Sequence, residues 1–538
     1  MTERSIGRSS ALLAGGTIAS RILGFLKAVV LIQAIGTFAS ADAFAVGNQL
    51  PNTIYVIVAG GALSAVLVPQ IVRSARHSDG GTAYINKLVT IALLVLALAA
   101  AVATLFAPQL VGLTSSFGPE KAGLATAFAY WCLPQIFFYG VYTILGEVLN
   151  ARNSFGPFTL APILNNFVAL GGLIVFIAIF GSDPDSLRQV SWWSPSAIAV
   201  LAGTATLGIA VQGLVLFAFW RRVGLRYRPD FRWRGVGLAA TGRIAGWSFG
   251  MILVTTAAGI VETRVVSTAS GVDSPSVAAL GNAWLVFMLP HSVVAVSIAT
   301  AYFTRMSESA AAGQFDRVRR DIAASIRQIT VIMVLAGVVL MVVAYPFGRV
   351  MSDTAGGSAG IGDVLLAFLV GLPAFSILFV LQRAFFALGD TRTPFLTTIF
   401  QAVIFTIGSL LVLAFVPKDQ VGVGVALMLS FAGILQAVLV GILLRRILGG
   451  HARRTLVSFA KDALAALPAT AVGIVVFALF GGIDDGSFAL SGRFQSIVTM
   501  AVVGVVMAAV YAGTLRLLRS SELSDALVPI VGRLRRSR

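Results

Sequence analysis

A few charged residues interrupt long apolar stretches of this sequence, and they have the clearest chemical potential. Arg21 and Lys27 lie in the first apolar stretch, and Arg264 lies late in the seventh. A charge at the centre of a membrane helix costs about 2.5 to 3.5 kcal/mol on insertion scales, so such residues are candidates for function. Arg offers phosphate oxygens a planar fork of donors, and Lys offers a point charge. The three cations predict a binding site for an anionic group such as a diphosphate.

Each of these cations also has a structural interpretation. Arg21 lies about eleven residues into its stretch, roughly 16 Å along a helix, where an internal ion pair is the alternative to substrate binding. Lys27 could instead extend toward the outer headgroups. Arg264 and its neighbour Glu262 could both lie at the level of those headgroups. The sequence leaves these alternatives open.

Three carboxylates accompany the cations. Asp42 begins the second apolar stretch, where a carboxylate also suits the positive end of a helix. Asp42 and Glu262 are candidate cavity or gate acids, and Glu262 or Arg264 could pair with Asp42 or Arg21 across a cavity. Asp390 lies in a short turn and is either a turn residue or part of a cation or gate site. The surplus of positive charge favours an anionic substrate, whereas an exporter of cations would show surplus carboxylates.

The elements that must hold these charges are membrane helices. The chain of 538 residues is 57% hydrophobic and 11% charged, whereas soluble domains carry about 25% charged residues. Crossing the hydrocarbon takes about 20 apolar residues. Runs of that length predict an all-α membrane protein with a retained first helix rather than a signal peptide. The fourteen predicted spans are 10–36, 41–71, 86–110, 122–150, 156–181, 195–220, 240–268, 276–304, 324–348, 361–387, 394–416, 421–444, 458–481 and 494–517.

The basic residues alternate from one connection to the next. With both termini in the cytoplasm, most of the 39 Lys and Arg residues fall on the inside, as the positive-inside rule requires. We therefore expect a multi-pass protein of the bacterial cytoplasmic membrane. The net charge of +17 then reflects basic loops facing anionic membrane lipids and not a nucleic-acid partner. The basic residues expected outside are Lys121, Arg188, Arg264, Arg349, Lys418 and Arg493.

Two Leu-Pro pairs indicate an internal repeat. Leu50-Pro51 recurs as Leu289-Pro290, and Leu133-Pro134 recurs as Leu372-Pro373, at the same offset. The offset spans six helices, so the two halves share one orientation, as in parallel repeats about an axis along the membrane normal. We expect two six-helix lobes (1–235 and 236–450) followed by two helices and a basic tail (451–538). Candidate hinge or kink residues are Gly24, Pro51, Pro134, Pro290 and Pro373.

No pattern of an enzyme is present in the sequence. It lacks the phosphate-binding loop of ATPases, the HExxH and CxxC motifs and the nucleophile elbow. The single Cys132 cannot form an intrachain disulfide, and the three histidines show no metal-ligand spacing. We expect a transporter that is not an enzyme and binds no cofactor or metal. Its drive would be coupling to Na⁺ or H⁺, the membrane potential, or consumption of the product.

Several motifs lie near the N-terminus, namely Ser20-Arg21-Ile22-Leu23-Gly24-Phe25, Ala41-Asp42-Ala43-Phe44, Leu50-Pro51-Asn52, Gly61-Ala62-Leu63-Ser64 and Val68-Pro69. Together they resemble the MurJ (MviN) family of the multidrug/oligosaccharidyl-lipid/polysaccharide exporter superfamily. The resemblance implies a lipid II flippase with alternating access, a central cationic cavity and a groove for the polyprenyl tail on the last two helices. It implies that Arg21, Lys27 and Asp42 match functional positions of the family, and that Asp390 matches its Asp before a Thr-Arg-Thr-Pro stretch.

The sequence also departs from the family pattern. An Arg-Arg pair and a Glu of many members are replaced by Tyr55-Val56 and Gly60, and a further Arg position falls near Trp284 and Leu285. We expect a thinner cationic cavity, in which Arg264 replaces a missing charge. The alternatives are a flippase for another polyprenyl-linked glycan (O-antigen or capsule type), a small-molecule antiporter, or a non-transporting scaffold. Cell-wall synthesis proteins are the expected protein partners.

Overall fold

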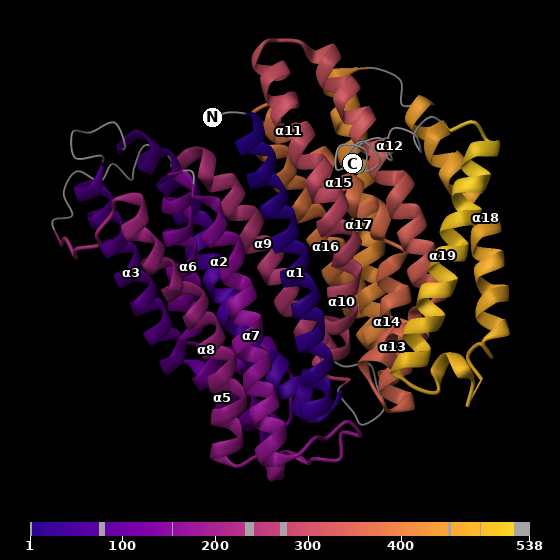
Figure 1. Cartoon of the computed structure of the whole chain (residues 1–538), viewed down its shortest axis with the longest axis horizontal. Helices are drawn as coiled ribbons and strands as arrows, with labels where there is room; N and C mark the ends of the chain where they lie inside the picture. The colour runs from indigo at the N-terminus through magenta and orange to yellow at the C-terminus, as the bar shows by residue number, and fades with distance from the viewer. Residues whose placement is uncertain are drawn as a thin grey trace. The chain divides into compact units, whose positions relative to one another are not determined.

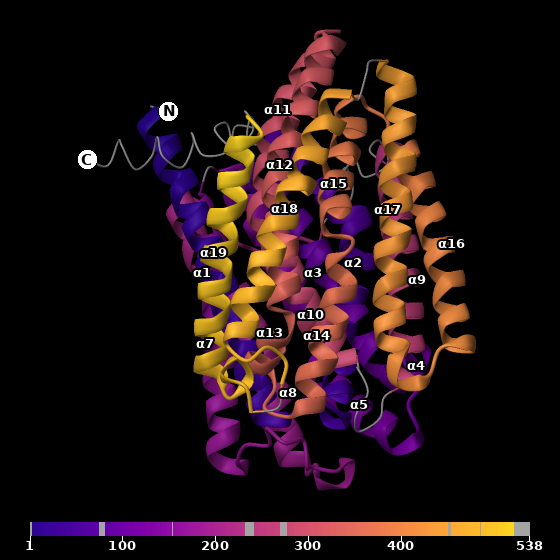
Figure 2. The ribbon, with the colours of Figure 1, turned by 90° about the vertical axis from the view of Figure 1, so that its right-hand side faces the viewer.

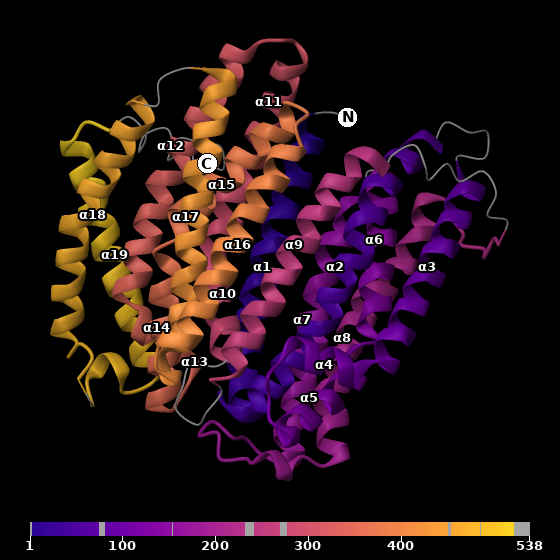
Figure 3. The ribbon, with the colours of Figure 1, turned by 180° about the vertical axis from the view of Figure 1, so that it is seen from behind.

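The computed structural model describes residues 3–74, 81–152, 154–231, 242–269, 277–449, 453–484 and 486–520. These residues form helices joined by turns and short 3₁₀ segments, with no strand among them. Contacts between backbones divide the chain into two compact units, unit 1 (Met1–Val272) and unit 2 (Asp273–Arg538). Figure 1 shows unit 1 in indigo to magenta, and Figure 3 shows it from behind.

Unit 1 is built around α2, which packs against α5, α6 and α9, while α7 packs against both α1 and α8. One core cluster among its described residues joins α3, α6 and α8 through buried aliphatic side chains and Trp220. Contacts place α9 in this unit, whereas the predicted division near 235 follows the sequence repeat and stays a prediction. The helices are α1 (Glu3–Ile35), α2 (Ala39–Ser74), α3 (Thr82–Leu105), α4 (Ala107–Thr114), α5 (Pro119–Cys132), α6 (Gln135–Ala151), α7 (Phe155–Phe180), α8 (Pro195–Trp220) and α9 (Gly242–Ser267).

Unit 2 is arranged around α12, which packs against α11, α15 and α18. The last two helices, α18 and α19, form a hairpin at one side of this unit, drawn in light orange and yellow in Figure 2. Buried Tyr511 of α19 donates to the carbonyl of Val331 of α12 at 3.1 Å. The helices are α10 (Val277–Pro290), α11 (Val296–Ala311), α12 (Phe315–Val342), α13 (Ala344–Met351), α14 (Ala355–Leu369), α15 (Leu372–Ala387), α16 (Arg392–Phe415), α17 (Val421–Leu448), α18 (Arg453–Leu479) and α19 (Arg493–Leu517).

The helices are long and apolar enough for a multi-pass membrane protein. Among the described residues 11 helices could cross a membrane, or up to 12 if the bent pair α14 and α15 forms one span. Helices α1 and α2 occupy the first two predicted spans, but several of their side chains lie outside the described residues. The all-α fold class is confirmed, and the count of fourteen spans stays a prediction.

The second repeated Leu-Pro pair, Leu133-Pro134 and Leu372-Pro373, coincides with two broken helices. Pro134 separates α5 from α6, and Pro373 lies in the first turn of α15, after a bend of 46° from α14. Proline has no N–H, so a carbonyl one turn earlier loses its helical partner. Hydroxyl groups from neighbouring helices bind carbonyls at both breaks, as polar side chains do in membrane helices. Thr206 of α8 donates to the carbonyl of Trp131 at 2.8 Å, and Ser430 of α17 donates to those of Ala367 at 2.8 Å and Phe368 at 3.1 Å.

The remaining hinge candidates differ among themselves. Pro290 ends α10 and is followed by one π-helical turn, His291–Ala295, before α11 begins. Such turns are rare and are found mostly as local bulges. Gly24 and Pro51 instead lie within the uninterrupted helices α1 and α2. Three of the five candidates therefore mark an irregular backbone, and the role of all five in motion stays a prediction.

Candidate functional site

The two cations of α1 are available for binding. Arg21 is exposed and Lys27 is half-buried. Within the described part of the chain, neither forms a hydrogen bond or an ion pair. Polar groups that lie at membrane depth and have no internal partner need water or a ligand instead. The structural alternative for Arg21, an internal ion pair, is absent from the described residues.

A buried amide of α7 fixes the rotation of α1 beside Arg21. The side chain of Asn166 is 7% exposed, and its Nδ2 donates to the Ser20 carbonyl at 2.9 Å. Successive residues of an α-helix point about 100° apart, so Arg21 turns away from the α7 contact that Ser20 makes. The sequence analysis missed Asn166, because a single amide in an apolar run carries no signal until its neighbour is known.

The loop between α7 and α8 holds the end of α1. The guanidinium of Arg188 donates to the carbonyls of Ala34 at 2.9 Å and Phe180 at 2.8 Å, and it lies 4.1 Å from the ring centroid of Trp192. Burial lowers the pKa of Arg188 from its ordinary value, and the nearby Asp183 carboxylate opposes that shift. The hydroxyl of Ser186 accepts from the backbone N–H of Thr37 at 2.8 Å. Half-buried Arg188, which the predicted topology places outside the membrane, thus has a structural role.

Asp42 forms a buried ion pair that the sequence did not reveal. Its side chain is 1% exposed, and Oδ2 lies 2.8 Å from Nζ of Lys121. The ammonium also lies 4.4 Å from the ring centroid of Phe117. The pair joins the first turn of α2 to the first turn of α5. The sequence predicts Lys121 only as an external loop charge, because residues from two different helices become neighbours only through packing.

Arg264 and Glu262 have different surroundings on α9. The Nη1 of Arg264 donates to the carbonyls of Gly112 at 3.0 Å and Leu113 at 3.3 Å, at the C-terminal end of α4. A cation at this position satisfies carbonyls that have no helical partner. Glu262 is half-buried and binds no other residue that the structure describes. The substitution of Arg264 for a missing cavity charge stays a prediction, and in this structure the guanidinium binds carbonyls of α4.

Asp390 caps a helix. Its Oδ1 accepts from the backbone N–H groups of Arg392 at 2.9 Å and Thr393 at 3.0 Å, and its Oδ2 accepts from the Thr393 hydroxyl at 2.6 Å. These contacts satisfy donors at the start of α16. They favour the turn-residue alternative, and a cation or gate role stays a prediction. No cluster of three or more His, Cys, Asp or Glu side chains suits a metal in the described ranges.

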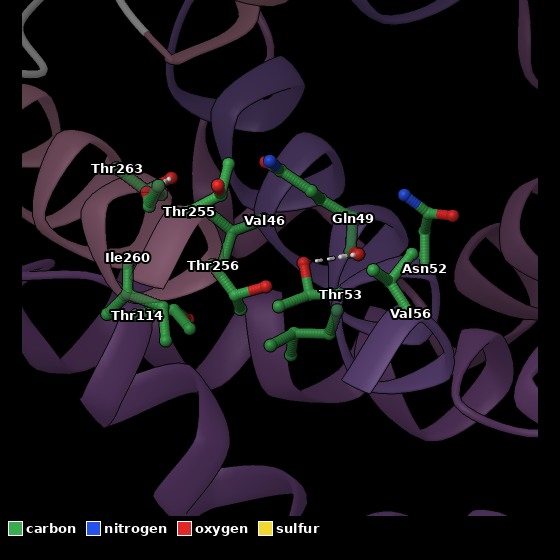
Figure 4. A pocket seen from close by; sticks show the side chains of 12 residues that line it. Val46, Gln49, Asn52, Thr53, Val56, Thr114, Thr255, Thr256, Ile260 and Thr263 are labelled. Atoms are coloured by element: carbon green, nitrogen blue, oxygen red, sulfur yellow. Dashed lines mark hydrogen bonds between the residues drawn. The ribbon is translucent and has the colours of Figure 1, made fainter. Parts of the chain in front are cut away.

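The described residues also form a pocket that the sequence analysis missed. A cavity of about 260 Å³ lies within unit 1, between α2 and α9, with Thr114 of α4 also lining it. Figure 4 shows its polar side chains, none of which is charged. A sequence signal existed, since these residues repeat at spacings of one helical turn in otherwise apolar helices. They are Gln49, Asn52 and Thr53 of α2 and Thr255, Thr256 and Thr263 of α9.

The aromatic position that replaces a family cation is packed in unit 2. The ring of Trp284 stacks on Phe287, with centroids 4.9 Å apart, and its edges meet Phe368 and Phe375 at 5.4 and 5.8 Å. An apolar cluster of this kind contributes packing instead of an anion contact. The expectation of a site with fewer cations stays a prediction.

Comparisons with known proteins place the chain in a transporter family. The sequence model of the family described as "Lipid II flippase MurJ" matches residues 31–491. The chain is 27% identical over 478 residues to a "Probable lipid II flippase MurJ" of Rhizobium tropici, covering 84% of each chain. It is 26% identical over 534 residues to the protein of the same name from Haemophilus influenzae, covering 93% of this chain and 98% of the other.

Solved structures show the same fold. A lipid II flippase MurJ in an inward closed conformation matches with a TM-score of 0.73 and 18% identity, over 94% of this chain and 99% of that chain. An inward-facing multidrug resistance MATE family transporter of the MOP superfamily matches with a TM-score of 0.65 and 16% identity, over 80% of this chain and 94% of that chain. At these identities the likeness concerns the fold alone.

Proposed function

The chain belongs to the MurJ family of lipid II flippases, and we propose that it moves lipid II from the inner to the outer leaflet of the bacterial cytoplasmic membrane. The observation that carries this proposal is the family match over residues 31–491, together with the fold of a MurJ structure. Both the family and the superfamily fold belong to transporters, which supports the proposal that the protein carries its substrate across the membrane without changing it chemically.

Arg21 and Lys27 bind the diphosphate of the lipid. They precede the matched family segment, so their role rests on the resemblance of their motif and on their free state among the described residues. A guanidinium that keeps its hydrogen-bond donors unused can bind two phosphate oxygens at once. Arg264 contributes only after it leaves the carbonyls of α4, which makes it the weaker of the proposed cations.

The polyprenyl tail stays in the bilayer beside α18 and α19. This hairpin exposes a series of large apolar side chains, as a surface in contact with lipid or with a polyprenyl chain would. Members of the series on α18 are Leu464, Leu467, Ile474, Val475 and Leu479, and those on α19 are Phe494, Ile497 and Val505.

Alternating access moves the headgroup without an ATP site in the chain. With both termini in the cytoplasm and an inside-negative potential, an anionic headgroup gains about 2.3 kcal/mol per charge per 100 mV when it moves outward. Coupling to Na⁺ or H⁺ is the alternative drive. Proteins of cell-wall synthesis, which consume the product, are the proposed partners.

The test is rescue of a bacterium depleted of its own lipid II flippase. The parent chain, Arg21→Ala and the control Arg228→Ala are expressed at matched membrane levels. Arg228 is an exposed arginine in the loop after α8, so its loss leaves the proposed site intact. Growth and the outward arrival of labelled lipid II are followed together.

We expect the parent and Arg228→Ala to rescue growth and export, and Arg21→Ala to fail. Failure of the correctly inserted parent would overturn lipid II as the substrate and favour another polyprenyl-linked glycan. Rescue by Arg21→Ala at the parent rate would keep the flippase and remove Arg21 as its main contact.

A further inference from the structure

The pocket between α2 and α9 combines hydrogen-bonding capacity with the absence of charge. Six polar side chains from these two helices face it, and Thr114 of α4 adds a seventh. None of the lining residues is Asp, Glu, Lys, Arg or His. A diphosphate or another multivalent ion would find no opposite charge here, so the pocket suits a neutral polar group.

The threonines of the pocket present acceptors. Each hydroxyl donates to a backbone carbonyl one turn earlier in its helix: Thr53 to Gln49 at 3.2 Å, Thr255 to Met251 at 2.9 Å, and Thr263 to Gly259 at 3.0 Å. A hydroxyl that donates within its own helix keeps its oxygen lone pairs available. These oxygens can therefore accept protons from the hydroxyl groups of a ligand.

The amides of the pocket present both donors and acceptors. The side chains of Gln49 and Asn52 are exposed to the pocket, and neither makes a hydrogen bond with any residue in the described ranges. Each carries two N–H donors and one carbonyl acceptor. An amide of a ligand can pair with such a group in both directions, as an acetamido substituent would.

The depth of the pocket makes these free groups informative. Asn52 lies about 20 Å along α2 from its first residue, and Thr256 lies about 16 Å from the end of α9, at 1.5 Å per residue. Both positions fall near the middle of a hydrocarbon layer about 30 Å thick. Unpaired amides facing lipid at that depth are costly, so the pocket holds water or a polar ligand.

The size of the pocket favours a group larger than one ion. Its volume is about 260 Å³, whereas a water molecule occupies about 30 Å³ in the liquid. We propose that this pocket is a second subsite for the flippase substrate, which binds the hydroxyl and acetamido groups of the amino sugars in the headgroup. The inference rests on the proposed function, and it assigns the sugars to α2 and α9 and the diphosphate to α1.

The subsite is tested by binding to the purified full-length protein in lipid nanodiscs. Two probes of equal prenyl length are compared: a lipid II analogue with a shortened tail, and the same prenyl diphosphate without sugars. The test variant is Gln49→Met with Thr255→Val, which keeps side-chain size and removes two hydrogen-bonding groups. The control is Thr300→Val, because Thr300 is exposed and donates to its own helix carbonyl at 2.7 Å, as Thr255 does, but lies on α11 outside the pocket.

We expect the double variant to bind the sugar-bearing probe about 10- to 30-fold more weakly, which corresponds to about 1.4 to 2 kcal/mol for the two lost hydrogen bonds. Its affinity for the bare prenyl diphosphate should stay within about twofold of the parent value, because neither lost group contacts the diphosphate. Thr300→Val should change neither affinity, and Arg21→Ala should weaken both.

Two results would overturn the subsite. One is a double variant that is as thermally stable as the parent and either loses affinity equally for both probes or loses none. The other is a parent that binds the bare diphosphate as tightly as the sugar-bearing probe. A parent that binds neither probe would instead overturn the proposed function itself.

Discussion

In both units a hydroxyl group of a neighbouring helix donates to a carbonyl beside a helix break. The units differ in whether the polar side chains compared below have hydrogen-bond partners. In unit 1, Thr206 of α8 binds a carbonyl beside the α5–α6 break, and in unit 2 Ser430 of α17 does so beside the α14–α15 break. In each half the donor comes from the sixth helix of the predicted repeat. The repaired breaks therefore belong to a shared scaffold.

The difference lies in the groups that this scaffold presents. In unit 1, Arg21 and Lys27 lack partners among the described residues. In unit 2, buried His291 shares a hydrogen bond with Ser376 at 3.0 Å, and its ring packs against Phe375, with centroids 4.7 Å apart. Satisfied groups support packing, whereas unsatisfied groups at membrane depth indicate binding. We infer that unit 1 carries most of the proposed headgroup contacts.

The largest effect should come from neutralising Arg21 of unit 1, and a substitution of His291 in unit 2 serves as the comparison. Arg21→Gln is expected to lower lipid II export by about 10- to 100-fold, since a hydrogen bond to a charged group contributes about 1.5 to 3 kcal/mol. His291→Gln, which can still bond to Ser376, should keep export within a few-fold. Export of labelled lipid II at matched membrane levels measures both. A folded His291→Gln protein that exports as poorly as Arg21→Gln would contradict the comparison.

The buried ion pair of unit 1 should dominate stability. Asp42→Ala leaves the Lys121 ammonium without its carboxylate, and breaking a buried pair in this way costs about 3 to 5 kcal/mol. The double variant Asp42→Ala with Lys121→Met should recover most of that loss, because no charge then stays uncompensated. Unfolding in detergent measures both changes. If the double variant is no more stable than Asp42→Ala, the pair is not the reason for the loss.

Removing the guanidinium of Arg264 tests whether Arg264 contributes less to lipid II export than Arg21 does. Because this group caps α4, Arg264→Ala should lower the free energy of unfolding by about 0.3 to 1 kcal/mol. Its export should fall by less than about tenfold, which is below the effect of Arg21→Gln. Parallel thermal unfolding and export assays measure the two effects. An export loss equal to that of Arg21→Gln would establish Arg264 as a full replacement for the missing family charge.

The smallest effects should be equal in the two units. Thr206→Val and Ser430→Ala each remove one hydroxyl from a repaired break, and interhelical hydrogen bonds in membranes contribute about 0.6 kcal/mol on average. We expect similar small losses of stability and unchanged export. Hydrogen exchange of the amides around each break offers a second measurement. A large loss in one unit alone would show that the two repairs are not equivalent.

The sequence by itself determined the class of the protein and the course of its helices. Apolar runs and alternating basic residues depend on local composition, and the bilayer imposes their length, so the predicted spans lie close to the observed helices. The second repeated Leu-Pro pair indicated the breaks between α5 and α6 and between α14 and α15, because proline acts on its own backbone. Arg21 and Lys27 were also identifiable from the sequence, because a charge in an apolar run is costly wherever the helix packs.

Tertiary structure decided which polar groups are free. Asp42 meets Lys121, Arg264 meets the end of α4, and Asn166 holds α1, and each contact joins helices far apart in the chain. Such pairs depend on the rotation and axial position of packed helices, which composition does not specify. The charge-free pocket arises likewise, because its amides and hydroxyls become one surface only when α2 and α9 lie side by side.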